Sequence, residues 1–322
     1  MKIAIFTDTF MPQLDGVVTA TISMAKGLAD RGHQVYIIAP KYRRKINEFS
    51  YKDVVVKRVA SVPAFFYKGY RFTLFWSRSL AKYLRKENID VIQLQTPVML
   101  GVHALLISRF LKKPIVGTFH TFFTDPQYTR HIGLNSKLIQ KLSWAYAKMY
   151  YNRCNLVTCP SESAREELAK HGLIEPIKVI SNGIDVSKFD NSNWESMKEK
   201  FNPSGDIILS VGRIAYEKNL ECLLRCFKFV LEQKKNAKLV IVGDGPQMGE
   251  LKATVKKMNL SESVVLTGII DHESLVKSGI FKASKVFVTV STTETQGITT
   301  LEAQANGLVC VGVDARGTRD LI

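Results

Sequence analysis

The sequence predicts an α/β protein of two domains, each with a parallel β-sheet covered by helices. At 322 residues the chain is about twice the usual length of a single domain. Short apolar segments of strand length alternate with longer segments of helical period, which is typical of βαβ units. This alternation restarts after a polar stretch near the middle. Because ligands of open parallel sheets bind at the carboxyl ends of strands, we expect the two sheets to face each other across a cleft that holds the site.

The first domain is predicted over residues 1–180. Its expected strands are 2–7, 34–39, 54–59, 90–95, 114–119, 155–159 and 178–180. Its expected helices are 18–31, 72–86, 99–111, 136–153 and 161–171. The start of the chain, with one Lys and no long apolar run, favours a first strand over a signal peptide.

A linker is predicted over residues 181–204, where an Asn182-Gly183 turn is followed by a polar stretch. The second domain, residues 205–322, has expected strands at 206–211, 238–242, 264–267, 285–289 and 309–313. Its expected helices are 219–233, 246–258, 273–278 and 299–305.

The charge of the chain is strongly one-sided. The net charge is +16, and residues 1–180 hold 27 Lys and Arg against 12 Asp and Glu. This excess predicts an anionic partner of the first domain: nucleic acid, a membrane surface or an acidic acceptor. Plain solubility is the alternative, although it would spread the charge more evenly. The five cysteines show no CxxC spacing, so buried free thiols are favoured over zinc or disulfides.

The most specific motif runs from Glu294 to Glu302, with two carboxylates flanking Gly297 at a predicted helix start. Gly297 permits a tight turn, and the amides that follow it suit a phosphate. The carboxylates can accept hydrogen bonds from sugar hydroxyls. The alternative is a pair of unrelated surface acids.

Two cations follow the first predicted strand of the second domain. Arg213 comes directly after Gly212, and Lys218 lies at the start of the next helix. Arg can bind a diphosphate with two donors while Lys acts as a point charge. Solvated cations are the alternative. The following turn, Gly243-Asp-Gly245, is weak evidence by itself.

The first domain offers Gly16, in the loop after its first strand, and His120, directly after another strand. Gly16 can expose backbone amides to a phosphate. The loop is not GxGxxG, and no acidic residue follows where a dehydrogenase needs one, which argues against a nicotinamide enzyme. A lone His is often structural, although a strand end favours a functional one.

Together these motifs resemble the retaining glycosyltransferases of family 4, which have two Rossmann-like domains in the GT-B arrangement. The resemblance covers nearly the whole chain and is strongest at 294–302, at Arg213 with Lys218, and at 181–185. It implies that Arg213 and Lys218 hold the donor diphosphate and that Glu302 holds the ribose hydroxyls.

The resemblance also implies further donor contacts. Glu294 and the amides of Gly297, Ile298 and Thr299 would hold the hexose. Gly16 would lie over the phosphates and His120 beside the transferred sugar. His120, Glu294, Arg213 and Lys218 are then the expected catalytic residues. The family needs no metal or other cofactor, so the helix dipole and the two cations would stabilise the leaving group.

Two departures from the family pattern matter. Many relatives have an aromatic residue before Gly297, where this chain has Gln296. Together with Pro12-Gln13 and the basic first domain, this resembles the bacterial diacylglycerol glucosyltransferases. The sequence also stops at Ile322 without the late helices that cross back to the first domain. We therefore expect a truncated C-terminal end and an incomplete second domain.

Two segments of the first domain combine cations with aromatic residues. One runs from Ala64 through Phe72 to Trp76, Arg78, Lys82 and Arg85; the other carries Lys137, Lys141, Trp144, Lys148 and neighbouring tyrosines. Such segments suit anionic lipid, and we expect Lys137, Lys141, Trp144 and Lys148 on the membrane and acceptor side. Buried aromatics beside solvated cations are the alternative, and single-stranded nucleic acid is a third reading.

The sequence thus predicts a transferase on the cytosolic face of the cell membrane. It would move a hexose, with UDP-glucose as the expected donor, to a diacylglycerol-type lipid at an anionic surface, without nucleic acid as a partner. One alternative is the same donor chemistry on a soluble or cell-wall acceptor. Another is a basic nucleic-acid or membrane-binding module without turnover.

Overall fold

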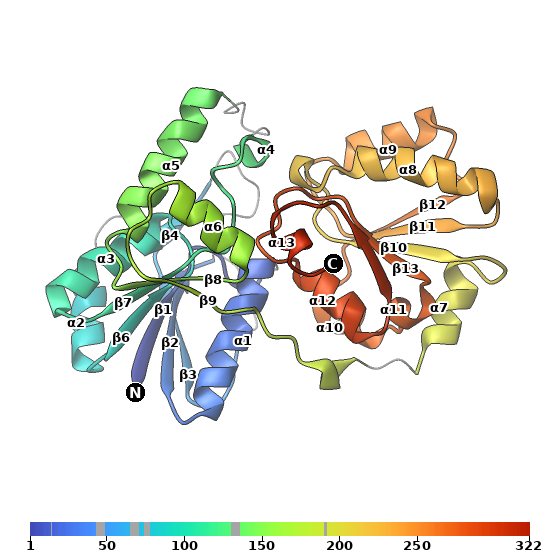
Figure 1. Ribbon diagram of the computed structural model, residues 1–322. Coiled ribbons are helices and arrows are strands. Elements are labelled where there is room, and N and C mark those ends of the chain that lie inside the picture. The colour runs from blue at the N-terminus through green and yellow to red at the C-terminus, as the bar shows by residue number, and fades with distance from the viewer. Residues whose placement is uncertain (14, 43–48, 65–70, 74–77, 130–135, 190–191) are drawn as a thin grey trace. The chain divides into compact units, whose positions relative to one another are not determined.

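The computed structural model describes residues 1–322 apart from 14, 43–48, 65–70, 74–77, 130–135 and 190–191. The chain forms two compact units (Figure 1). One contains Met1–Thr124 and Lys137–Gly183, and the other contains Asp125–Ser136 and Ile184–Ile322. The short segment Asp125–Ser136 thus groups with the second unit, although it precedes the expected linker.

The first unit is built on a seven-stranded parallel sheet of order β3-β2-β1-β6-β7-β8-β9. Its strands are β1 (Lys2–Phe6), β2 (Gln34–Pro40), β3 (Val54–Val59), β6 (Val91–Leu94), β7 (Ile115–Thr118), β8 (Leu156–Cys159) and β9 (Ile177–Val179). All seven predicted strands are present, and no strand end differs from its prediction by more than one residue.

Helices cover both faces of this sheet. They are α1 (Gly16–Asp30), α2 (Arg78–Lys86), α3 (Met99–Leu111), α5 (Lys137–Tyr151) and α6 (Glu162–Lys170). Alternate residues of β1 serve the two faces, because side chains of a strand point to opposite sides. Ile3 and Ile5 pack with α1, whereas Ala4 and Phe6 pack with α2, α3 and α5.

The expected helix 72–86 is wrong at its start. Its first described residues form strand β5 (Arg71–Thr73), which pairs antiparallel with β4 (Ser61–Pro63). Arg71 binds the backbone and hydroxyl of Ser61 at 2.7 and 2.8 Å, which fixes this pair. The helix begins among the described residues only at Arg78.

The second unit has a five-stranded parallel sheet of order β12-β11-β10-β13-β14. Its strands are β10 (Ile207–Val211), β11 (Lys238–Val242), β12 (Val264–Gly268), β13 (Val286–Thr289) and β14 (Val309–Gly312). Its helices are α4 (Pro126–Thr129), α7 (Trp194–Phe201), α8 (Leu220–Gln233), α9 (Met248–Lys257), α10 (His272–Lys277), α11 (Ile280–Ala283), α12 (Ile298–Ala305) and α13 (Arg316–Arg319), with 3₁₀ turns η2 (Val186–Lys188) and η3 (Tyr216–Lys218). In Figure 1, α8 and α9 lie on one side of this sheet, and α7, α10, α11 and α12 on the other. The predicted α/β class with two parallel sheets is confirmed.

Helix α7 lies inside the stretch expected as a linker. Met197 and Phe201 pack against the core that contains Phe281 of α11. Gly279 permits this approach, because a Cβ there would lie 2.6 Å from the backbone nitrogen of Trp194. The polar composition of residues 190–203 led to the prediction of a linker, whereas α7 is a helix with one apolar side.

In the part of the chain that the structure describes, no helix has both the length and the apolar character that a membrane crossing requires.

Candidate functional site

Two loops at the carboxyl ends of β10 and β11 are joined by their backbones. Gly212 N donates to Val242 O at 2.9 Å, and Ile214 N donates to Asp244 O at 3.0 Å. Gly243 has φ +143°, and a Cβ there would lie 1.9 Å from Gly212 O. The Gly243-Asp-Gly245 turn, which was weak evidence in the sequence, therefore needs glycine at position 243. Only glycine lets it pack against the loop that carries Arg213.

Arg213 forms an ion pair between Nη2 and Glu217 Oε1. Glu217 is 1% exposed, and its backbone oxygen accepts a 2.9 Å hydrogen bond from Ser291 Oγ. The buried carboxylate orients the guanidinium while leaving part of it accessible to solvent. Sequence reasoning missed Glu217, although its spacing of four residues from Arg213 could have indicated the pair.

Lys218 forms the second ion pair, from Nζ to Glu294 Oε1. The two residues follow β10 and β13, which are neighbours in the sheet. Burial raises the pKa of Glu294, but the charges of Lys218 and Arg213 and a hydrogen bond from Ser291 outweigh it and lower the pKa overall. Glu294 is therefore ionised at neutral pH, and the structure brings together three of the expected catalytic residues.

Gly297 is the N-cap residue of helix α12 and has φ +97°, a left-handed conformation that favours glycine. Thr300 N donates to Gly297 O at 3.0 Å. The amides of Ile298 and Thr299 belong to the first turn, whose N–H groups have no acceptor inside the helix. This helix start is thus able to bind an anion or a sugar oxygen.

The C-terminal helix α13 supports the same loop. Gly317 N donates to Glu294 O at 3.0 Å, and a Cβ at Gly317 would lie 2.4 Å from the carbonyl carbon of Thr295. Arg316 forms a 2.8 Å ion pair with Asp125. This contact links the segment before α4 to the second unit.

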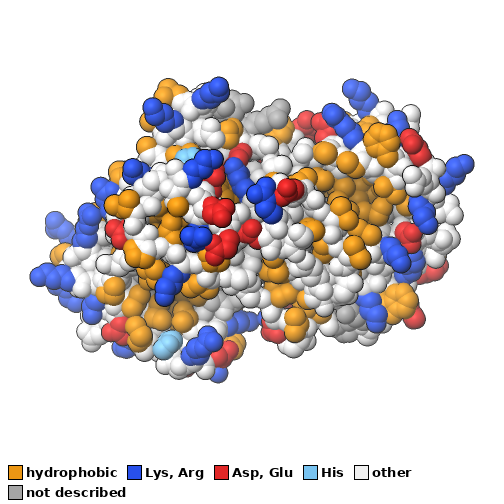
Figure 2. Space-filling view, in the orientation of Figure 1, with side chains coloured by type: hydrophobic (Ala, Val, Ile, Leu, Met, Phe, Trp, Pro, Cys, Tyr) orange, Lys and Arg blue, Asp and Glu red, His pale blue; other side chains and the backbone are white. Residues whose placement is uncertain are grey.

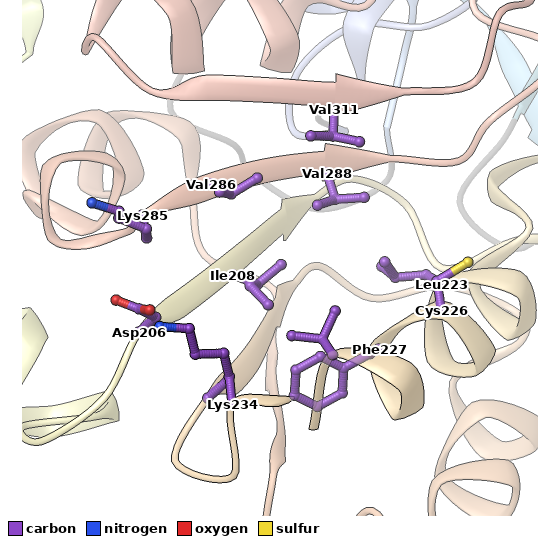
Figure 3. A pocket seen from close by; sticks show the side chains of 12 residues that line it. Asp206, Ile208, Leu223, Cys226, Phe227, Lys234, Lys285, Val286, Val288 and Val311 are labelled. Atoms are coloured by element: carbon purple, nitrogen blue, oxygen red, sulfur yellow. The ribbon is translucent and has the colours of Figure 1, made fainter. Parts of the chain in front are cut away.

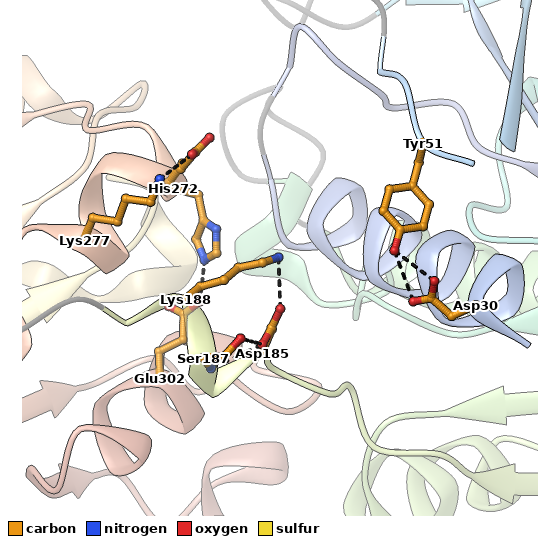
Figure 4. Close-up of polar contacts among 9 residues, drawn as sticks. Asp30, Tyr51, Asp185, Ser187, Lys188, His272, Lys277 and Glu302 are labelled. Atoms are coloured by element: carbon orange, nitrogen blue, oxygen red, sulfur yellow. Dashed lines mark hydrogen bonds and ion pairs between the residues drawn. The ribbon is translucent and has the colours of Figure 1, made fainter. Parts of the chain in front are cut away.

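Glu302 lies on α12 and is almost fully buried. Its Oε1 is 2.5 Å from Nε2 of His272, the first residue of α10. Figure 4 shows the imidazole pointing at the carboxylate, with Lys188 of η2 beside them. The expected ribose ligand is therefore already hydrogen-bonded to a side chain that sequence reasoning missed.

The first unit carries the candidate residues Gly16 and His120 at the carboxyl edge of its own sheet. Gly16 begins α1 and is exposed, and an added Cβ would meet no atom within 4 Å. Its backbone is accessible to a ligand. His120 follows β7 and is hydrogen-bonded to Gln95 Oε1. Burial lowers the pKa of His120 to about 4, so its ring is neutral at pH 7.

Asp8 is a buried acid at the same edge that sequence reasoning did not single out. Its carboxylate accepts hydrogen bonds from Thr96 Oγ1 at 2.7 Å and Leu100 N at 2.8 Å. Burial raises the pKa of Asp8 to about 6 against these hydrogen bonds. Its contact with the first turn of α3 shows that it ties this helix to β1.

The expected membrane-side residues divide into two groups. Lys137, Lys141 and Lys148 are exposed on α5. The prediction for Trp144 is wrong, because Trp144 is 8% exposed and stacks on His171 with ring centroids 3.6 Å apart. An aromatic at this position of α5 faces the sheet rather than solvent.

The other aromatic and basic segment is only partly described. Phe65, Phe66, Tyr67, Lys68, Gly69, Tyr70 and Trp76 lie outside the described residues. Arg78, Lys82 and Arg85 are exposed on α2, and Arg85 lies over the ring of Phe110, 4.6 Å from its centroid.

An apolar cavity of about 340 Å³ lies on the second sheet (Figure 3), and Arg213, Lys218 and Glu294 do not line it. Leu223 and Phe227 of α8 line it together with Val288 and Val311. Asp206 and Lys285, which precede β10 and β13, place it toward the amino ends of the strands. It therefore does not suit a charged donor. Cys226, which lines this cavity, is a free and exposed cysteine, contrary to the expectation of buried thiols, whereas Cys154 and Cys159 are free and buried as expected.

Among the described residues, no group of three or more His, Cys, Asp or Glu side chains is arranged to hold a metal ion. Metal-independent chemistry stays a prediction.

Two known protein families match nearly the whole chain. The model of Glycosyltransferase Family 4 matches residues 14–188, and that of Glycosyl transferases group 1 matches residues 192–322. The alpha-monoglucosyldiacylglycerol synthase of Streptococcus pneumoniae is 32% identical over 314 residues, which cover 95% of this chain and 70% of that protein. A GDP-mannose-dependent alpha-mannosyltransferase of Corynebacterium glutamicum is 28% identical over 328 residues, covering 100% and 74%.

Solved structures share the fold. The crystal structure of Anabaena Alr3699/HepE in complex with UDP and glucose has a TM-score of 0.74 at 18% identity. The match covers 100% of this chain and 83% of that one.

Proposed function

This chain belongs to glycosyltransferase family 4, and from that membership we propose that it transfers glucose from UDP-glucose to a diacylglycerol-type lipid with retention of configuration. The observation that carries the proposal is the charged cluster at the carboxyl ends of β10 and β13. There Arg213 and Lys218 lie with Glu294 beside the start of α12.

The two cations are proposed to hold the donor diphosphate. Each is held by one carboxylate, Arg213 by Glu217 and Lys218 by Glu294. A cation oriented in advance needs little reorganisation when negative charge grows on the departing diphosphate, which is where stabilisation accelerates transfer. The first amides of α12 add the positive end of the helix dipole. We propose that this set acts without a metal ion.

Sugar recognition is proposed for Glu294, Gly297, Ile298 and Thr299. Glu294 Oε1 is paired with Lys218, and its carboxylate retains lone pairs that can accept from hexose hydroxyls. Glu302 is proposed as the acceptor for the ribose. Gly16 would lie over the phosphates. His120, being neutral, could exchange a hydrogen bond with the transferred sugar without adding charge.

The choice of donor and acceptor rests on similarity. The alpha-monoglucosyldiacylglycerol synthase of S. pneumoniae is more similar to this chain than the mannosyltransferase is, at 32% against 28% identity. Gln296, where many relatives have an aromatic residue, is 3% exposed in the loop between β13 and α12. These features favour glucose and a lipid over mannose.

Helix α5 supports a lipid surface as the place of reaction. It contains no Asp or Glu, and Lys137, Lys141 and Lys148 follow one side of it. Beside them Leu138, Leu142 and Met149 are 66%, 56% and 48% exposed, at spacings of four and seven residues. Figure 2 shows Lys and Arg side chains among hydrophobic ones at the end of the first unit where α5 lies. An exposed apolar stripe beside a row of lysines suits the interface of an anionic membrane.

We therefore propose a peripheral enzyme at the cytosolic face of the cell membrane, with no nucleic acid as a partner. The main alternative is the same donor chemistry on a soluble or cell-wall acceptor. A binding module without turnover is set aside, since the chain belongs to a transferase family.

The test is a transfer screen read by mass spectrometry. UDP-glucose, UDP-galactose and GDP-mannose are each incubated with diacylglycerol in mixed micelles containing anionic phospholipid, and with water-soluble acceptors. The expected product is monoglucosyldiacylglycerol from UDP-glucose alone. Transfer only from GDP-mannose, or only to soluble acceptors, would contradict the proposal.

A further inference from the structure

The pair formed by His272 and Glu302 closes the proposed ribose site. The Glu302 side chain is 2% exposed, whereas that of His272 is 43% exposed. Glu302 Oε1 accepts from His272, and Oε2 is buried with no hydrogen-bond partner among the described residues. A hydroxyl group arriving from solvent therefore meets the imidazole before it meets the carboxylate.

We propose that His272 gates donor binding by occupying the carboxylate oxygen of Glu302 that the ribose of the donor must reach. The proposal rests on the proposed role of Glu302 in holding the donor. It assigns a new function to a residue outside the expected site.

The moving partner is His272 rather than Glu302. Glu302 lies in the fifth position of α12, between the buried Thr300 and Ala303. Turning its carboxylate away would require α12 to shift. His272 begins the six-residue helix α10, which is capped by Asp271 through a 2.9 Å bond to Ser274 N. Rotation about its side-chain bonds is enough to carry the imidazole into solvent.

The unpartnered Oε2 indicates that Glu302 is incompletely satisfied when only His272 binds it. A buried carboxylate oxygen without a donor is costly. Two ribose hydroxyls could donate to both oxygens, whereas His272 donates to one. The donor would thus replace one hydrogen bond to Glu302 with two, which favours displacement of the imidazole.

The gate is sensitive to protonation. The hydrogen bond to Glu302 raises the pKa of His272 most strongly, and burial and the charge of Lys188 lower it in part. The charged groups that face His272 are Glu302 on α12, Lys188 on η2 and Asp271 at the cap of α10. Lys188 is itself paired with Asp185 at 3.5 Å, as Figure 4 shows. On α11, Lys282 lies over the ring of Trp194.

The direction of the pH effect follows from this shift. Because the pKa is raised by the pair, protonation strengthens the closed state, and this strengthening is lost as pH rises through the raised pKa. Donor affinity should therefore increase from pH 6 to pH 8. If the charged pair keeps about nine-tenths of the molecules closed, the apparent affinity is about tenfold below that of the open state.

The experiment is calorimetric titration of UDP-glucose into the full chain without acceptor, from pH 6 to pH 8. If the transfer screen selects GDP-mannose, that donor is used instead. Neither diphosphate diester has a phosphate group that titrates in this range. His272→Ala should bind about tenfold more tightly than the wild type at pH 6, with the difference shrinking toward pH 8.

Two further variants separate the possible outcomes. His272→Gln keeps a donor for Glu302 but does not titrate, so its affinity should be independent of pH. His33→Ala, a histidine of the first unit that contacts the N-terminus, is the matched control and should keep the wild-type profile.

The gate is overturned if His272→Ala binds the donor more weakly than the wild type, since that result assigns His272 to positioning Glu302. It is also overturned if the wild type and His272→Ala share one pH profile. Glu302→Ala tests the underlying assumption separately. If Glu302→Ala binds the donor with unchanged affinity, the proposed ribose role itself is wrong.

Discussion

Lys218 and Glu294 lie 76 residues apart in the sequence and form an ion pair at the ends of two neighbouring strands. The pair joins the cation proposed for the diphosphate to the acid proposed for the hexose. Since both side chains are largely buried, each restricts the other to one position. The position of this ion pair therefore depends on the pairing of β10 with β13.

The first prediction concerns the leaving group. Lys218→Ala should lower kcat by about a hundredfold, because a charge that stabilises the departing diphosphate is lost. The measurement is kcat at saturating acceptor. Arg225→Ala is the matched control, since Arg225 also pairs with a glutamate but is exposed on α8. An unchanged kcat in Lys218→Ala would remove Lys218 from the reaction.

The second prediction is a pH dependence of stability. The pKa of Glu294 is lowered, so its ionised form contributes stability above its ordinary pKa of 4.5, and this is lost as pH falls through the lowered value. Glu294→Gln should therefore be less stable than the wild type near pH 7, by about 1–3 kcal/mol. The difference should shrink in acid. Denaturant unfolding at several pH values measures it, and a difference that grows in acid would contradict the assignment.

The third prediction concerns the loops that carry the cations. Gly243→Ala places a Cβ 1.9 Å from Gly212 O, so we expect a loss of several kcal/mol or failure to fold. Gly27→Ala in α1 meets nothing within 4 Å and should stabilise the protein, by about 0.5–1 kcal/mol. Thermal unfolding compares the two. Equal stabilities would show that the close approach is not required.

The fourth prediction separates two contributions to membrane binding. Replacing Lys137, Lys141 and Lys148 with Gln should weaken binding to vesicles of phosphatidylglycerol and phosphatidylcholine at low salt. Leu138→Gln with Leu142→Gln should instead remove the binding that persists at 1 M salt, where the Debye length is only about 3 Å. Co-sedimentation is the measurement.

Ile174→Gln, at an exposed apolar residue outside α5, is the control for the leucine variants. UDP-glucose affinity should be unchanged in all of these proteins. Equal wild-type binding to neutral and anionic vesicles, or tighter binding to RNA, would count against the lipid surface.

The fifth prediction is activity without a metal ion. Arg213, Lys218 and the start of α12 are proposed to neutralise the leaving group, so EDTA should leave the transfer rate within about twofold. Dialysis against EDTA followed by assay tests this. Loss of activity that Mg²⁺ or Mn²⁺ restores would show that a metal ion does the work assigned to the cations.

Strands and helices were predictable wherever the hydrophobic periodicity of their own segment determines them. The prediction is matched residue for residue by β3, β11 and α3, because each is a run of uniform period with a clear boundary. It failed at 72–86, where the first residues pair with β4, and at α7, whose apolar side is hidden in a polar stretch. Both depend on partners distant in the sequence.

The candidate site was predictable as a set of residue types but not as a set of pairs. Glycine and charge at strand ends singled out Arg213, Lys218, Glu294 and Gly297 as candidates, because phosphate and sugar binding call for such residue types there. His272 was missed because nothing local marks it, and Glu217 was missed although it lies only four residues from Arg213. Trp144 was misplaced because a helix with aromatics around it does not reveal which side faces the sheet.

The sequence alone therefore determined the two-sheet class, the family and the residues proposed to bind a nucleotide sugar. These follow from local periodicity and from motifs at strand ends. Only the tertiary structure decided which charges neutralise one another, which glycines are required by close backbone contact, and that His272 covers Glu302. Such relationships arise where parallel strands bring distant loops to one edge, and burial then forces each charged group to find a partner.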